Sequence, residues 1–138
     1  MNDENKIKIL FIDDDRATNF LNKYIAKSND KIDSISLSHS GFEAIDFLKS
    51  CLHDYSKKPN LIFLDINMPA MNGWDFLEEF YELDKKLIDG IKVVILSSSD
   101  DPTDLNKFKK NGMLLDFLKK PLNKEALNSV LIKILIEV

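Results

Sequence analysis

Five short apolar segments, separated by stretches of helical periodicity, constrain the fold of this chain more than any other feature of its sequence. Four of them, residues 7–12, 61–64, 91–96 and 114–118, are largely continuous apolar runs, which are typical of strands covered on both faces. The remaining segment, residues 32–37, alternates apolar and polar residues. That alternation is typical of an edge strand with one wetter face.

A helical pattern follows each of these segments. Apolar residues recur at helical spacing within residues 17–25, 44–52, 74–81 and 126–134. Asp101 and Pro102 have the form of an N-cap followed by the first residue of a further helix. Because strands and helices alternate strictly, we predict an α/β, flavodoxin-like (βα)5 fold, a doubly wound parallel sheet with strand order 2-1-3-4-5 and helices on both faces.

The composition is that of one ordered domain. A chain of 138 residues suits a single domain, which we expect to span residues 1–138, with its core at about 6–137 and no effector domain. The net charge of −4 lacks the basic surplus of proteins that bind nucleic acid directly. No apolar run is long enough for membrane insertion. Cys51 is the single cysteine, which fits a reducing, cytoplasmic location.

Acidic residues stand where two neighbouring strands of the predicted sheet end. Asp13 and Asp14 follow the first strand and Asp65 follows the third, and ligands of doubly wound sheets bind at this switch point. Three adjacent carboxylates require a proton or a cation to offset their charge. Mg²⁺ fits this requirement, with a backbone carbonyl near Asn67 as a further ligand, and Mn²⁺ is the expected substitute.

The other two strand ends supply groups suited to phosphoryl transfer. Ser97 follows the fourth strand, and Lys119 and Lys120 follow the fifth. A carboxylate beside Mg²⁺ can act as a nucleophile toward phosphorus, and the transfer depends on neutralising charge on the phosphoryl oxygens. Adjacent strand residues face opposite ways, so only one of the two lysines can point into the site. We expect this to be Lys120, the residue before Pro121.

These segments together resemble a response-regulator receiver domain of the stand-alone, chemotaxis-regulator type. The matching stretches are ILFIDDD (9–15), LIFLDINMPAMNG (61–73), VVILSSSDDP (93–102) and FLKKPL (117–122). Each stretch alone is weak evidence for the family, but the four occur in the family's order and spacing and together extend over essentially the whole chain.

The resemblance implies a role for each matching residue. Asp65 is the expected phosphoacceptor, Asp14 a direct metal ligand, and Asp13 a ligand acting through a water. Asn67 is expected to offer its backbone carbonyl to the metal. Ser97 and Lys120 are expected to contact the phosphoryl group. Ser97 and the aromatic Phe117 are the expected switch residues, and the Lys120-Pro121 peptide is expected to be cis.

The resemblance also implies partners. A sensor histidine kinase or a phosphotransfer protein is the expected donor of the phosphoryl group. The surface formed by the fourth helix, the fifth strand and the fifth helix of the (βα)5 pattern is expected to contact a downstream protein. Apolar residues on more than one face of the last helix indicate either a dimer or partner surface, or a helix end packed under its own neighbours; they include Ile132, Leu135, Ile136 and Val138.

Three other functions could in principle draw on the same residues. A phosphatase with an aspartyl nucleophile needs a second acid two residues later, where this chain has Asn67. A flavin-binding module needs a hydroxyl- and glycine-rich loop where this chain has Asp13, Asp14 and Asp15. A scaffold that never turns over phosphate has no need of the acid, hydroxyl and lysine set. The receiver interpretation accounts for all of these residues. It predicts a regulatory phosphoacceptor rather than an enzyme with a separate substrate.

Overall fold

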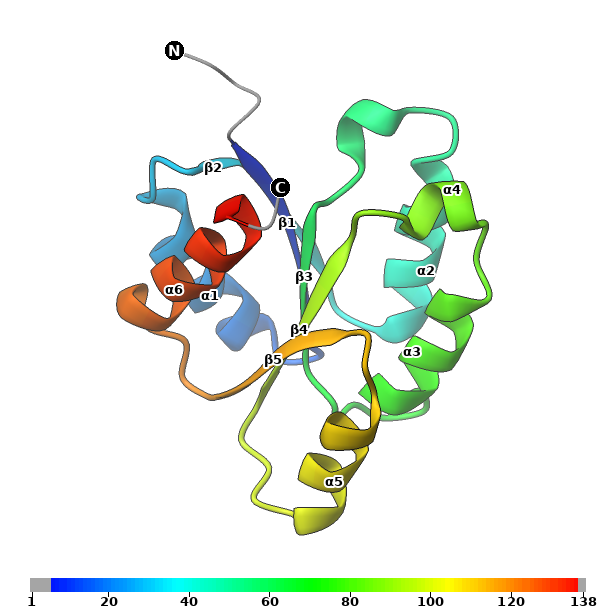
Figure 1. Cartoon of the computed structure of the whole chain (residues 1–138), viewed down its shortest axis with the longest axis vertical. Helices are drawn as coiled ribbons and strands as arrows, with labels where there is room; N and C mark the ends of the chain where they lie inside the picture. Colours follow the sequence, from blue (N-terminus) through cyan, green and yellow to red (C-terminus); the bar gives the residue numbers. More distant parts are fainter. Residues whose placement is uncertain (1–5, 137–138) are drawn as a thin grey trace.

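A five-stranded parallel sheet runs through the computed structural model, which describes residues 6–136 (Figure 1). The strand order is β2-β1-β3-β4-β5, as the sequence predicts. The strands are β1 (Ile7–Ile12), β2 (Ile32–Ser38), β3 (Leu61–Leu64), β4 (Lys92–Ser97) and β5 (Leu114–Lys119). The helices are α1 (Arg16–Lys27), α2 (Gly41–Ser50), α3 (Gly73–Tyr81), α4 (Lys85–Ile88), α5 (Pro102–Lys110) and α6 (Lys124–Ile136), with a 3-10 turn, η2 (Tyr55–Lys57).

Each face of the sheet carries its own apolar core. Helices α1 and α6 cover one face, and α2, α3 and α4 cover the other (Figure 1). Alternate residues of a strand therefore enter different cores: Ile9 and Phe11 pack toward α6, while Leu10 and Ile12 pack toward α2 and α3. Because both faces are covered, the central strands are largely apolar, which explains the continuous runs in the sequence.

Helix α1 turns most of its periodic apolar residues away from the sheet, although Ile25 packs partly against the core. Phe20, Leu21 and Tyr24 are 66%, 56% and 60% exposed, whereas Asn19 and Asn22 are buried. The Asn19 side-chain amide donates to the carbonyls of Asp13 and Ser38, each at 3.0 Å. Hydrogen bonding to the ends of β1 and β2 thus sets the rotation of α1, and most of its apolar stripe remains exposed.

Two elements have no counterpart in the sequence prediction. The four-residue helix α4 has one fully buried side chain, Leu87, and the turn η2 lies in the connection that leads into β3. The two are tied together by Lys58, whose Nζ donates to the backbone carbonyl of Asp89 at 2.7 Å. Both elements are too short to show a period, so their sequence pattern could not reveal them.

Helices α5 and α6 differ in how firmly they are held. Helix α5 has no buried residue, and its ring contact with the sheet is an edge-on packing of Phe108 against Phe117, with centroids 5.6 Å apart. Helix α6 buries four apolar side chains, Leu127, Val130, Leu131 and Ile134. Ile132 and Ile136 remain 40% and 77% exposed, and Val138 lies outside the described residues. Among residues 6–136, no helix is long and apolar enough to cross a membrane.

Candidate functional site

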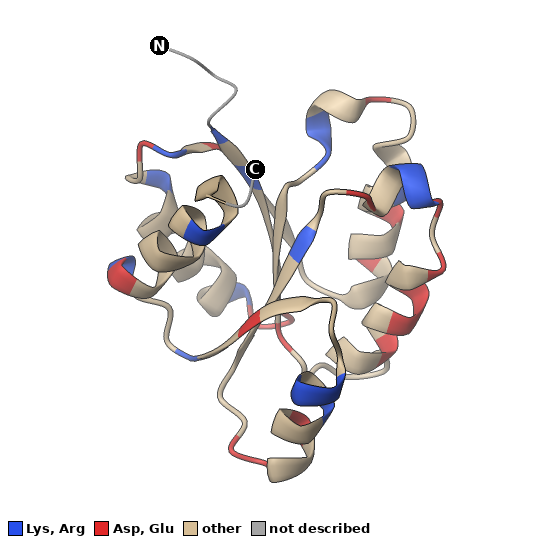
Figure 2. Ribbon diagram, viewed as in Figure 1, with Lys and Arg blue, Asp and Glu red and all other residues tan. Residues whose placement is uncertain are grey.

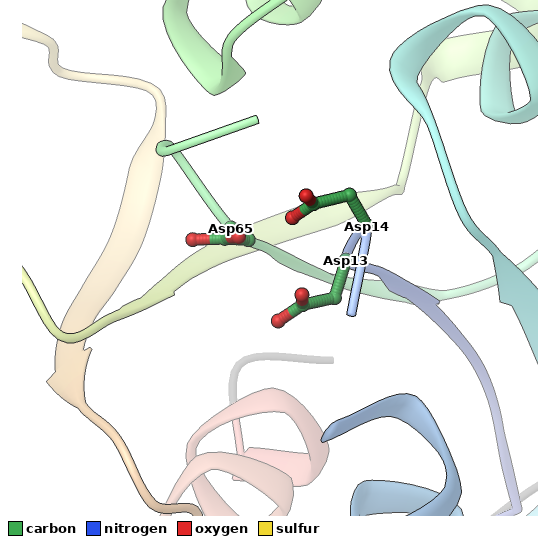
Figure 3. A group of neighbouring side chains, drawn as sticks. All are labelled: Asp13, Asp14 and Asp65. Carbon is green, nitrogen blue, oxygen red and sulfur yellow. The ribbon is translucent and has the colours of Figure 1, made fainter. Parts of the chain in front are cut away.

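Three carboxylates converge where β1 and β3 end side by side. Oxygen atoms of Asp13, Asp14 and Asp65 all lie within 4.8 Å of one another (Figure 3). Asp13 and Asp65 are 3% and 5% exposed, whereas Asp14 is exposed. The register Ile12↔Leu64 between the two strands places the residues that follow them at the same edge of the sheet, which is why the cluster forms.

The ammonium group of Lys120 lies against the two buried carboxylates. Its Nζ is 2.6 Å from Asp13 Oδ2 and 3.6 Å from Asp65 Oδ1. Burial and the neighbouring charge of Asp13 raise the pKa of Asp65 to about 6, although Lys120 opposes the rise. Burial alone lowers the pKa of Lys120, but its hydrogen bond and charge interaction with Asp13 outweigh that effect and raise it. The pocket therefore holds more negative charge than one lysine neutralises.

Backbone hydrogen bonds fix the acids in place. The Asp13 N–H donates to Ser38 O at 3.1 Å, and the Asp65 N–H donates to Ile12 O at 3.0 Å. Asp13 Oδ1 accepts from the Asp15 N–H at 2.9 Å. Asp15 is the N-cap of α1, and its hydrogen bonds to Thr18 and to the Ala17 N–H lower its pKa. Asp15 thus begins the helix while Asp13 and Asp14 remain in the cluster.

The turn after β3 is held tightly against Asp65. A Cβ atom added at Gly73 would lie 2.7 Å from the backbone oxygen of Asp65 and 2.7 Å from Ile66 Cα, so only glycine fits. Ala70 has a φ of 67°, in the left-handed region that L-residues rarely adopt. The Asn67 N–H donates to Asp65 Oδ1 at 3.2 Å, so the turn folds back over this carboxylate.

Ser97 and Lys120 are joined through their backbones. Ser97 is fully buried at the end of β4, and its carbonyl accepts from the Lys120 N–H at 2.9 Å. The Lys120-Pro121 peptide is cis, as the resemblance implies. Lys119 points away from the acids and pairs with Asp100. Phe117 is half-buried on β5 beside α5, outside the acid cluster.

The donor set fits a hard divalent cation. The three converging groups are all carboxylates, and oxygen ligands with surplus negative charge are those that Mg²⁺ prefers. Burial of Asp13 and Asp65 beside each other makes the cluster unfavourable in its fully ionised form without a cation. Asp13, Asp14 and Asp65, with the Asn67 carbonyl, are the residues that would hold the ion.

Two features of the site region escaped sequence reasoning. The clamp formed by Asn19 was missed, although two asparagines within an otherwise apolar helical pattern were a signal, because asparagine disfavours helix interiors. The second is a bond between α3 and α5, in which Trp74 Nε1 donates to Asp104 Oδ1 at 2.9 Å. No local pattern could reveal a contact across 30 residues.

The structure is a doubly wound α/β domain with acidic residues gathered at the switch point of its sheet (Figure 2). The chain belongs to the response regulator receiver domain family, whose model matches residues 9–132. Proteins of this family take part in two-component signalling.

Known proteins of similar length agree with this assignment. A two-component response regulator from Cytophaga hutchinsonii has a crystal structure that superposes with a TM-score of 0.86 at 35% identity, covering 95% of this chain and 98% of that one. The two-component response regulator ARR17 of Arabidopsis thaliana is 30% identical over 129 residues, covering 86% of this chain and 78% of that protein.

Other relatives are much longer. A protein-glutamate methylesterase/protein-glutamine glutaminase of Methanococcus maripaludis is 30% identical over 116 residues, which is 84% of this chain. The chain spans 29% of the length of that relative and 45% of an uncharacterised response regulatory protein of Staphylococcus epidermidis. The similarity therefore concerns the receiver portion of these proteins.

Proposed function

We propose that Asp65 accepts a phosphoryl group from a phosphohistidine on a sensor histidine kinase or a phosphotransfer protein, in the presence of Mg²⁺ or Mn²⁺. The single observation that carries this proposal is the position of Lys120, whose ammonium contacts Asp13 and Asp65 within a cluster of three carboxylates. Three carboxylates, one of them the proposed nucleophile, and an ammonium that can follow the phosphoryl group thus lie in one pocket.

The transfer is a substitution at phosphorus. A carboxylate oxygen of Asp65 forms the new P–O bond as the P–N bond breaks, and the bonding electrons return to the imidazole of the donor. Bound metal supplies neutralisation of the charge on the phosphoryl oxygens. Lys120 exchanges its contact with Asp65 for one with the phosphoryl group, and the Ser97 hydroxyl donates a hydrogen bond to a phosphoryl oxygen. The later hydrolysis is also self-catalysed, so the domain is a regulated phosphoacceptor with no separate substrate.

The proposed partners use different faces. The exposed apolar side of α1, formed by Phe20, Leu21 and Tyr24, begins one turn after the acid cluster and is the proposed contact for the donor. The α5–β5–α6 surface is the proposed contact for a downstream protein, because Phe117 packs on α5 and pairs through its strand with Ile95, two residues before Ser97. The exposed Ile132 and Ile136 on α6 are its candidate homodimer contacts. The buried Cys51 suits the reducing cytoplasm proposed as the location.

Intact-mass measurement with a small acyl phosphate tests the proposal. Wild type is expected to gain one phosphoryl group when Mg²⁺ is present and none in EDTA. Asp65→Asn is expected to gain none, while Asp46→Asn, which replaces an exposed aspartate on α2, is expected to behave as wild type. Equal phosphorylation of Asp65→Asn and wild type would refute the assignment of the acceptor.

A further inference from the structure

A second concave site lies at the end of the sheet opposite the acid cluster. It is an open cleft of about 790 Å³, bounded by α3, α4, the start of β4 and the segment that leads from α5 into β5. Strand β4 runs from this cleft, at Lys92, to the acid pocket, at Ser97, so the two sites are about 16 Å apart along the strand. The cleft shares no residue with the proposed phosphoacceptor site.

The floor of the cleft is apolar. Phe80, Ile91 and Val93 belong to the core and contribute to the lining. Tyr81 stands edge-on to Phe80, with ring centroids 5.5 Å apart, and Met113 lines the cleft although 67% of it is exposed. An exposed methionine adapts to the shape of an apolar ligand, and small-molecule sites are lined mainly by hydrophobic and aromatic groups. The lining therefore suits an apolar body.

Three lysines, Lys85, Lys86 and Lys92, also line the cleft. All three are exposed, and no ion pair within residues 6–136 includes any of them. One carboxylate, that of Asp89, lies among them, so ammonium groups predominate. An apolar cleft thus has a positive border in a chain whose net charge is −4.

The wall formed by α4 is held in position from outside the cleft. Leu87 is the one buried side chain of this four-residue helix, which is little packing for so short an element. Lys58 supplements it, because its Nζ donates to the carbonyl of Asp89 at 2.7 Å and to that of Lys86 at 3.4 Å. Both acceptor residues line the cleft. The connection into β3, which the proposed phosphoryl transfer does not use, thereby keeps the cleft preformed.

We propose that this cleft binds a small amphipathic carboxylate, with its apolar body on the aromatic and aliphatic floor and its carboxylate among the three lysines. Burial of the apolar body supplies affinity, and the lysines select a negative head group. A cationic head group would meet three ammonium groups. The volume of the cleft lies in the range of small-molecule sites, roughly 300–1,000 Å³. The inference does not depend on the proposed function.

Titration with decanoate below its micellar concentration, followed by ¹H–¹⁵N NMR in EDTA without phosphodonor, tests the proposal. Saturable shifts are expected at the backbone amides of residues 88–93 and 112–114. Acetate has the carboxylate without the chain, and decylammonium has the chain with the opposite charge. Each is expected to bind at least about tenfold more weakly than decanoate, because each lacks one of the two contributions to binding.

Variants locate the two halves of the site. The double variant Lys86→Glu/Lys92→Glu is expected to weaken decanoate binding about tenfold, because two attractions become repulsions. Gly112 lines the cleft, and a Cβ atom there would have no atom within 4 Å, so Gly112→Leu is expected to fold and to compete with decanoate for the space. Lys49→Glu makes the same charge change at an exposed position of α2 and is the control that should bind as wild type does.

Five results would overturn the proposal. The first is the absence of any saturable shift with decanoate. The second is equal affinity for decanoate and decylammonium, and the third is unchanged affinity in the double lysine variant. The fourth is a set of shifts centred on the exposed apolar side of α1 instead of the cleft. The fifth is movement of the cleft amides when the protein alone is diluted, which would identify a second copy of this chain as the occupant.

Discussion

Replacing Asp65 by asparagine is expected to stabilise the metal-free protein. The folded structure raises the pKa of this carboxyl from 3.8 to about 6, so its ionised form is disfavoured in the fold relative to the unfolded chain. At about 1.4 kcal/mol per pKa unit, the penalty approaches about 3 kcal/mol at pH 7.5 as an upper value. Asparagine removes the charge and keeps an oxygen that can accept from the Asn67 N–H, which lies 3.2 Å away.

The pH dependence has a definite sign. Between the unfolded pKa near 4 and the folded pKa of about 6, wild type binds more protons when folded, so its stability falls as the pH rises. The stability of Asp65→Asn does not fall in this way as the pH rises. Its advantage is therefore expected to shrink from about 3 kcal/mol at pH 7.5 to about 1.5 kcal/mol at pH 5.

Urea denaturation in EDTA at these two pH values measures the difference. Asp46→Asn replaces an exposed aspartate and is expected to change stability by less than about 0.5 kcal/mol at both values. Equal stability of Asp65→Asn and wild type at pH 7.5 would refute the reasoning. So would an advantage that does not decrease on acidification, since the destabilisation would then not arise from ionised Asp65.

Three further outcomes follow from the turn and the acid cluster. Gly73→Ala is expected to lower the free energy of unfolding by about 1–3 kcal/mol in urea titrations, because its Cβ would lie 2.7 Å from the Asp65 carbonyl oxygen. The control Gly112→Ala should be nearly neutral, because a Cβ there would have no atom within 4 Å. Equal effects of the two substitutions would contradict the close approach at Gly73. Ala70→Gly is expected to stabilise by about 0.5–1 kcal/mol by relieving the φ of 67°, and a loss of stability in the same titration would show that the turn is unstrained. Millimolar Mg²⁺ is expected to raise the Tm of wild type and EDTA to reverse the rise, with a smaller response in Asp14→Asn; an equal response would place the ion away from Asp14.

The sequence predicted the sheet because its strands are buried on both faces. Continuous apolar runs, their alternation with helices and the strand order of doubly wound folds were sufficient for the topology that the structure shows. The rotation of α1 could not be predicted from the sequence, because two hydrogen bonds from Asn19 to the carbonyls of Asp13 and Ser38 set it, and not the burial of the apolar stripe. Helix α4 was missed since four residues with one buried leucine carry no period.

The acid cluster was predictable for a related reason. Once strand order is known, residues directly after β1 and β3 must be neighbours, so Asp13, Asp14 and Asp65 come together without any knowledge of side-chain packing. The bond from Trp74 to Asp104 depends instead on how α3 and α5 lean toward each other. That inclination comes from the tertiary packing of α3 and α5 and leaves no trace in local sequence.

In helix α1, the side chains that pack the helix onto the domain are different from the apolar side chains that it presents at the surface. Asn19, Asn22 and Ala26 hold the helix to the domain, while Phe20, Leu21 and Tyr24 face outward. Substitutions on the outer side are therefore nearly free of cost to folding. The outer side, proposed above as the contact for the phosphoryl donor, can therefore change its partner specificity while the fold stays the same.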